Sequence, residues 1–160
     1  MDCEGAIDFY PQSGDVTWNS SFVREFVDAR HKVESISVDC TTIDGYVRKT
    51  GLVPSFIKID TEGTELEVLK GAAATIEAHK PILVLEFNPK SAARAGTSIA
   101  GITKYLEDLS YSLKVITPTK WGKYRIRNEE PFRVEIHTVG DLVNVICVPT
   151  KPGFQRSLER

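Results

Sequence analysis

Apolar and polar residues alternate along this chain in short blocks that predict strands separated by helices. The strand-like blocks are Ala6–Tyr10, Val33–Asp39, Ser55–Asp60, Ile82–Phe87, Tyr111–Thr117 and Leu142–Val148. Helical spacing of apolar residues, with start and stop signals, predicts helices from Thr42 to Arg48, from Thr64 to His79 and after Ser98. This alternation predicts an α/β fold whose sheet is mostly parallel and ends in an antiparallel strand pair.

The pattern also predicts how the central elements are buried. Ile82–Phe87 is a nearly continuous apolar run, which is typical of a strand buried on both faces. In the helix before it, Thr64 and Glu67 have the spacing of a capping box. The apolar stripe expected to face the core consists of Leu66, Leu69, Ala73 and Ile76.

Two segments lack a clear period. The polar run Lys90–Thr97 predicts a loop. The segments Lys120–Arg127 and Phe132–His137 predict a hairpin or a long insertion, joined by the acidic turn Asn128–Pro131.

The strand Ser55–Asp60 ends at two acidic residues and a glycine, and a helix follows at once. In a parallel α/β sheet, the carboxyl ends of the strands open into the crevice where ligands bind. We therefore predict Asp60 and Glu62 as catalytic residues. The alternatives are that Asp60 is a turn or capping acid and that Glu62 only complements the helix dipole.

Three further residues near these strand ends are predicted to bind substrate. Gly63 is expected to supply a backbone conformation that a side chain would forbid. Glu86 closes an apolar strand, either in the crevice or at the exit of the strand into water, and Asn88 has the same ambiguity because Asn-Pro is a common turn. Asp60 and Glu62 alone are too few ligands for a divalent cation, so no metal is predicted.

Composition limits the possible functions. The length of 160 residues suits one domain, predicted at residues 1–150, with a flexible tail at 151–160. A formal net charge of −2 argues against nucleic acid or an anionic membrane as partner. The sequence contains no run of about 18 apolar residues, so it predicts no membrane-spanning helix. Cys3, Cys40 and Cys147 are scattered, which predicts reduced thiols in a cytoplasmic protein.

The segment around the acidic turn resembles a known family. FIKIDTEG at residues 56–63, LKGA at 69–72 and the Pro81-led strand that ends in Glu86 are similar to the FkbM family of S-adenosylmethionine-dependent methyltransferases. The resemblance implies a Rossmann-like sheet, S-adenosylmethionine as cofactor and O-methylation of a small-molecule or sugar hydroxyl. It also implies that Asp60 acts as a base or aligns the acceptor hydroxyl with the methyl group.

One family feature has no counterpart in this sequence. Family members begin with a glycine-rich loop that holds the cofactor, whereas the glycines at positions 5, 14, 45, 51 and 63 stand alone. The resemblance therefore implies a carboxyl-terminal half, incomplete at its N-terminus, with unknown cofactor-binding residues. Such a half could be a truncated chain, the product of a misplaced gene start or a natural remnant.

Two functions remain possible from the sequence. The first is a methyltransferase that acts as part of a complete chain on a small-molecule acceptor. The second is a non-catalytic interaction module that lacks cofactor binding. A half-sheet would leave one edge exposed, and an exposed edge favours a homodimer.

Overall fold

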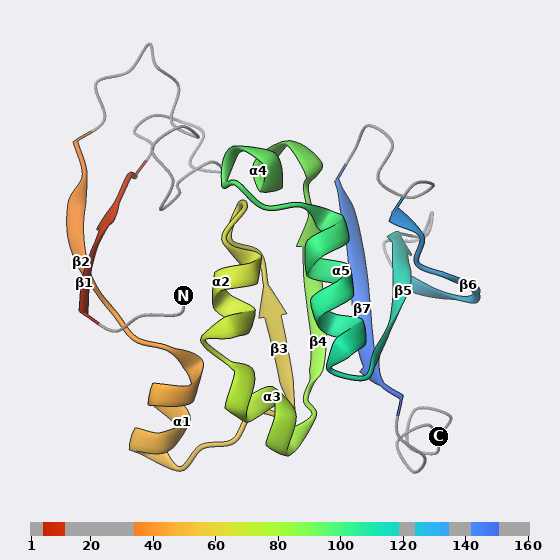
Figure 1. Ribbon diagram of the computed structural model, residues 1–160, viewed down its shortest axis with the longest axis horizontal. Coiled ribbons are helices and arrows are strands. Elements are labelled where there is room, and N and C mark those ends of the chain that lie inside the picture. Colours follow the sequence, from red (N-terminus) through yellow and green to blue (C-terminus); the bar gives the residue numbers. More distant parts are fainter. Residues whose placement is uncertain (1–4, 12–33, 119–123, 135–141, 151–160) are drawn as a thin grey trace.

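The structure, a computed structural model, describes residues 5–11, 34–118, 124–134 and 142–150 (Figure 1). In these ranges the chain has a mixed α/β fold with two separate sheets. The strands are β1 (Gly5–Phe9), β2 (Ile36–Cys40), β3 (Phe56–Ile59), β4 (Ile82–Phe87), β5 (Tyr111–Pro118), β6 (Tyr124–Pro131) and β7 (Val143–Pro149). The helices are α1 (Ile43–Thr50), α2 (Glu65–Lys70), α3 (Ala73–His79), α4 (Pro89–Arg94) and α5 (Ile99–Asp108). None of these helices has the length and the apolar composition needed to cross a membrane.

The larger sheet has the strand order β3-β4-β7-β5-β6. β3 and β4 are parallel, and the three other neighbouring pairs are antiparallel. Therefore β3, β4 and β5 run in one direction, and β7 lies between β4 and β5 in the opposite direction. The prediction of a mostly parallel sheet is wrong, because the last strand returns to the middle of the sheet.

The strand predicted at Val33–Asp39 forms β2 but does not join the larger sheet. It pairs antiparallel with β1, from Gly5 opposite Cys40 to Phe9 opposite Ile36. β2 then leads directly into α1, whose N-cap is Thr42. The first two predicted strands therefore form a separate ribbon.

Helices α2, α3 and α5 lie over one face of the larger sheet (Figure 1). Burial alternates along β4: Leu83, Leu85 and Phe87 are buried, and the residues between them are only partly buried. The prediction that this strand is buried on both faces is wrong, because its alternate side chains point away from the helix-covered face. The core under the helices contains Ile59, Leu69, Ile76, Leu83, Leu85, Phe87, Ile102, Leu106, Val145 and Cys147.

Several local predictions differ from the structure. The predicted loop Lys90–Thr97 contains α4, which begins with Asn88 as N-cap and Pro89 in its first turn. The single helix predicted from Thr64 is divided into α2 and α3. The predicted turn Asn128–Pro131 is wrong, because these residues belong to β6, which pairs with β5. Residues 120–123 and 135–137 of the predicted hairpin or insertion lie outside the described residues. The predicted tail, 151–160, lies outside the described residues.

Asp44 connects α1 to the start of α3. Its carboxylate accepts hydrogen bonds from the backbone N–H groups of Ala74 and Thr75, at 3.0 and 2.8 Å, and from the Thr75 hydroxyl at 2.6 Å. Burial raises the pKa of Asp44, but these hydrogen bonds outweigh burial and lower the pKa overall. A side chain distant in sequence therefore caps α3, which has no capping side chain of its own at Ala72.

We predict that Asp44→Ala lowers the free energy of unfolding by about 1–2 kcal/mol at pH 7, because α3 loses its cap. Because the pKa of Asp44 is lowered by folding, this contribution is present above about pH 4 and is lost as the pH falls through the folded-state pKa. Urea denaturation at pH 7 and pH 3 measures both values. Asp108→Ala is the control, since Asp108 is exposed and forms a surface ion pair with Lys104. An equal loss at both pH values would contradict the prediction.

Candidate active site

Parallel pairing brings Asp60 and Glu86 together. Ile59 at the end of β3 pairs with Leu85 of β4. The next residue on each strand is acidic, and both side chains project to the face opposite Ile59 and Leu85 because side chains alternate along a strand. Asn144 of β7 lies opposite Glu86, where its side chain favours the charged form of the carboxylate and so tends to lower the pKa of Glu86.

The turn after β3 adds a third carboxylate. Glu62 has a φ of 52° and Gly63 a φ of 108°, both in the left-handed region that L side chains rarely adopt. The expectation that Gly63 supplies an unusual backbone conformation is confirmed. The Ser91 hydroxyl of α4 donates to Oε2 of Glu62 at 3.1 Å, so a helix beyond β4 holds the end of this side chain.

The capping box predicted from Thr64 and Glu67 is not formed. The Thr64 side chain makes no capping hydrogen bond to α2, and its hydroxyl donates to the Thr61 carbonyl at 3.3 Å. Thr64 has φ −99° and ψ 22°, outside the extended conformation of a typical N-cap. The neighbouring Glu65 instead accepts hydrogen bonds from the turn, including the Gly63 N–H at 3.0 Å.

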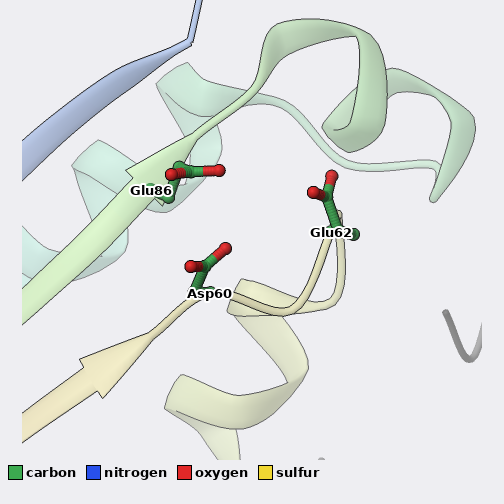
Figure 2. Close-up of side chains that lie close together, drawn as sticks. All are labelled: Asp60, Glu62 and Glu86. Carbon is green, nitrogen blue, oxygen red and sulfur yellow. The ribbon is translucent and has the colours of Figure 1, made fainter. Parts of the chain in front are cut away.

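The three carboxylates form one cluster (Figure 2). One oxygen from each of Asp60, Glu62 and Glu86 lies within 4.8 Å of the others. Burial raises the pKa of Glu86, and the negative charges of Asp60 and Glu62 raise it further. Lys58 forms an ion pair with Asp60 and supplies positive charge beside the cluster. The arrangement thus holds like charges close together at the carboxyl edge of the sheet.

This arrangement is suited to proton transfer and to holding a hydroxyl group. A carboxylate with a raised pKa is a stronger base, and neighbouring carboxylates accept hydrogen bonds from a hydroxyl. Asp60, Glu62 and Glu86 could also hold a divalent cation, since oxygen ligands suit Mg²⁺ and Ca²⁺. Glu86 is the third carboxylate that the sequence argument lacked, but three carboxylates alone do not identify a metal, and we assign none.

The residues predicted to bind substrate have different surroundings. Glu86 is part of the cluster, and Gly63 lies in the turn beside it. Oδ1 of Asn88 accepts hydrogen bonds from the N–H groups of Lys90 and Ser91, at 3.1 and 3.2 Å, and so caps α4. A role for Asn88 in substrate binding remains a prediction.

Sequence reasoning missed three residues that surround the cluster. Ser91 lay in a predicted loop, although the Asn-Pro start of α4 was a signal for a helix there. Asn144 contacts Glu86 only because β7 inserts beside β4. Glu65 has no sequence signal, because its contacts depend on the shape of the turn.

Comparison with known proteins identifies the family. The model of the methyltransferase FkbM domain matches residues 3–113, which is more than half of the chain and includes all three clustered carboxylates. The chain therefore belongs to the FkbM methyltransferase domain family. No curated protein and no solved structure gives a significant match.

We predict that Glu86→Gln raises the melting temperature at pH 7. Folding raises the pKa of Glu86, so its contribution to stability is present below about pH 4 and is lost as the pH rises through the folded-state pKa. At pH 7 the substitution removes a partly buried negative charge and its repulsion by Asp60 and Glu62. At pH 3.5 it has little effect, because the carboxyl is protonated in both states. Thermal melts at the two pH values, with the exposed Glu107→Gln as control, measure the difference. A lower melting temperature for Glu86→Gln at pH 7 would contradict repulsion within the cluster.

Proposed function

We propose that this member of the FkbM family functions as the carboxyl-terminal portion of an S-adenosylmethionine-dependent methyltransferase that methylates a small-molecule or sugar hydroxyl. The observation that carries the proposal is the convergence of Asp60, Glu62 and Glu86 at the carboxyl ends of parallel strands β3 and β4. Family membership supports methyl transfer in general. The larger sheet would then be half of a Rossmann-like sheet, continued beyond the β3 edge.

The clustered residues have separate roles in this proposal. When bound, S-adenosylmethionine supplies a methyl group on a positively charged sulfur. The chain's own part would be proton transfer: a carboxylate of the cluster would accept the proton of the acceptor hydroxyl. Glu86 is the best base, because its pKa is raised, while Asp60 and Glu62 orient the hydroxyl.

The described residues do not fit the cofactor as well as they fit the acceptor. Within the described ranges, the turn after β3 contains only one glycine, Gly63, and none of these ranges contains a loop with paired glycines. We therefore assign no residue to cofactor binding and expect this chain alone to bind S-adenosylmethionine more weakly than micromolar. Calorimetry measures this affinity, and micromolar binding would refute the proposal that the cofactor is held by another portion.

We also propose a cytoplasmic location. Cys147 is a buried free thiol, and Cys40 is partly buried. Burial raises the pKa of Cys147, which keeps this thiol protonated and unreactive. Cys3 lies outside the described residues. Reduced thiols are typical of a reducing compartment.

An interaction module is a second candidate function, favoured by the exposed edge of the larger sheet. Among the described strands, β3 has β4 as its only neighbour in that sheet. Beside it, Leu52, Val53 and Phe56 have exposed fractions of 63%, 48% and 54%, and with α1 they line a groove of about 420 Å³. A second copy could add its own β3 here. Antiparallel pairing about Ile57 would place Phe56 opposite Lys58 of the partner subunit, so no like charges would face each other.

We predict that Asp60→Ala and Glu62→Ala each lower the turnover of a complete, active form of the protein by about 100-fold, because a misplaced acceptor hydroxyl costs about this much. Transfer of labelled methyl groups to hydroxyl acceptors measures turnover, and thermal melts check folding. Asp108→Ala is the control, since this exposed carboxylate lies at the end of α5. Unchanged rates in both variants would exclude a role of the cluster in the reaction.

We predict that the second function, if present, is lost in Phe56→Lys. The substitution would set positive charge against Lys58 of the partner subunit and remove apolar contact at the β3 edge. Sedimentation velocity should show a dimer for the wild type and a monomer for Phe56→Lys. Tyr124→Lys is the matched control, since Tyr124 is an aromatic residue with an exposed fraction of 74% on edge strand β6. A monomeric wild type would exclude the dimer.

A further inference from the structure

Glu65 is a buried acidic residue whose hydrogen bonds are directed to the turn rather than to its own helix. Its exposed fraction is 4%. Oε1 accepts hydrogen bonds from the Thr61 N–H at 3.2 Å, the Thr61 hydroxyl at 3.3 Å and the Gly63 N–H at 3.0 Å. A buried carboxylate is costly unless its oxygens are satisfied, so these contacts account for the presence of an acid at this position.

The three donors lie on the residues immediately before and after Glu62. The backbone of Glu62 adopts a left-handed conformation, with φ 52°, which a residue with a side chain keeps only where its surroundings impose it. Glu65 fixes both neighbours of Glu62 at once, and so supplies that constraint. A turn released from Glu65 would relax toward ordinary backbone angles and would carry the Glu62 side chain with it.

The other end of Glu62 is held from a different element. The Ser91 hydroxyl, on a side chain with an exposed fraction of 3%, donates to Oε2 of Glu62 at 3.1 Å. This contact can form only if the turn presents Glu62 toward α4. Glu65 therefore sets the backbone of Glu62, and Ser91 holds the Glu62 carboxylate. Together these two contacts bring Glu62 to Asp60 and Glu86.

We propose that Glu65 is a positioning residue, which ties the 61–63 turn in the conformation that directs the Glu62 carboxylate to Ser91, Asp60 and Glu86. Glu65 contacts no reacting atom in this proposal and acts through Glu62. Its consequence for methyl transfer rests on the function proposed above. The geometry of the turn does not rest on that function and is tested separately.

The test compares three variants on the same helix. Glu65→Ala removes the acceptor, whereas Glu65→Gln keeps a side-chain oxygen that can accept the same hydrogen bonds. Glu67→Ala is the matched control, because Oε2 of Glu67 is buried without a hydrogen-bond partner in the described part of the chain. The readout is the nuclear Overhauser contact between the Glu62 and Ser91 side chains in the folded protein, with thermal melts to confirm folding.

We expect the intensity of this nuclear Overhauser contact to fall at least fivefold in Glu65→Ala. We expect the intensity to be unchanged in Glu65→Gln and Glu67→Ala. If Glu65→Ala does not fold, Glu65→Asp takes its place, since its shorter side chain cannot reach all three donors. An unchanged contact in the folded variant would overturn the proposal, because Glu65 would then only stabilise the fold.

Turnover gives an independent readout in a preparation that transfers methyl groups. Glu65→Ala should lower kcat by about 100-fold with little change in the KM for the cofactor, because a displacement of about 1 Å costs that much. Glu65→Gln should restore most of the rate. If the wild type transfers no methyl group even when the portion that binds the cofactor is supplied, the proposed function fails, and the contact between Glu62 and Ser91 still decides the role of Glu65.

Discussion

The parallel pairing of β3 with β4 is the constraint on which the candidate site depends. Both strands run in one direction, so their carboxyl ends meet at one edge of the sheet, and antiparallel strands would have separated Asp60 from Glu86. The register is fixed by the core, since Ile59 and Leu85 pair on the face that the helices cover. A slip of one residue would turn Glu86 toward that core. Ordinary apolar packing therefore sets the position of the acidic groups.

Packing alone does not explain why three like charges stay together. Each carboxylate has its own partner: Lys58 pairs with Asp60, Ser91 donates to Glu62, and Asn144 lies opposite Glu86 and favours its charged form. These partners come from β3, α4 and β7, so the cluster forms only when the complete sheet and α4 are assembled. Despite these partners, burial raises the pKa of Glu86, and repulsion from Asp60 and Glu62 raises it further. Such retained repulsion is typical of sites where stability is given up for function.

The sequence predicted most of the strands and placed Asp60 and Glu86 at the ends of two of them, because strand ends can be read from apolar runs. It left open whether Glu86 lies in the crevice or at the exit of its strand into water. It could not predict that β7 inserts beside β4, since an apolar strand carries no information about its neighbours. The burial of β4 was predicted wrongly for a similar reason, because an apolar run does not show what covers each face. The apolar residues on its second face are only partly buried. At Thr64 a local pattern failed, because tertiary contacts of Glu65 determine the turn.

The two candidate functions are linked through Lys58. This residue lines the groove beside the β3 edge, and its ammonium group pairs with Asp60 of the cluster. The hydrogen bond to Asp60 raises the pKa of Lys58, so the site stabilises the charged form of the ammonium group. A strand that covered the β3 edge would shield this ion pair from water and strengthen the interaction, because charges attract more strongly at lower dielectric. Whatever pairs with β3, a second copy or the other portion of a methyltransferase sheet, would therefore also change the electrostatics of Asp60.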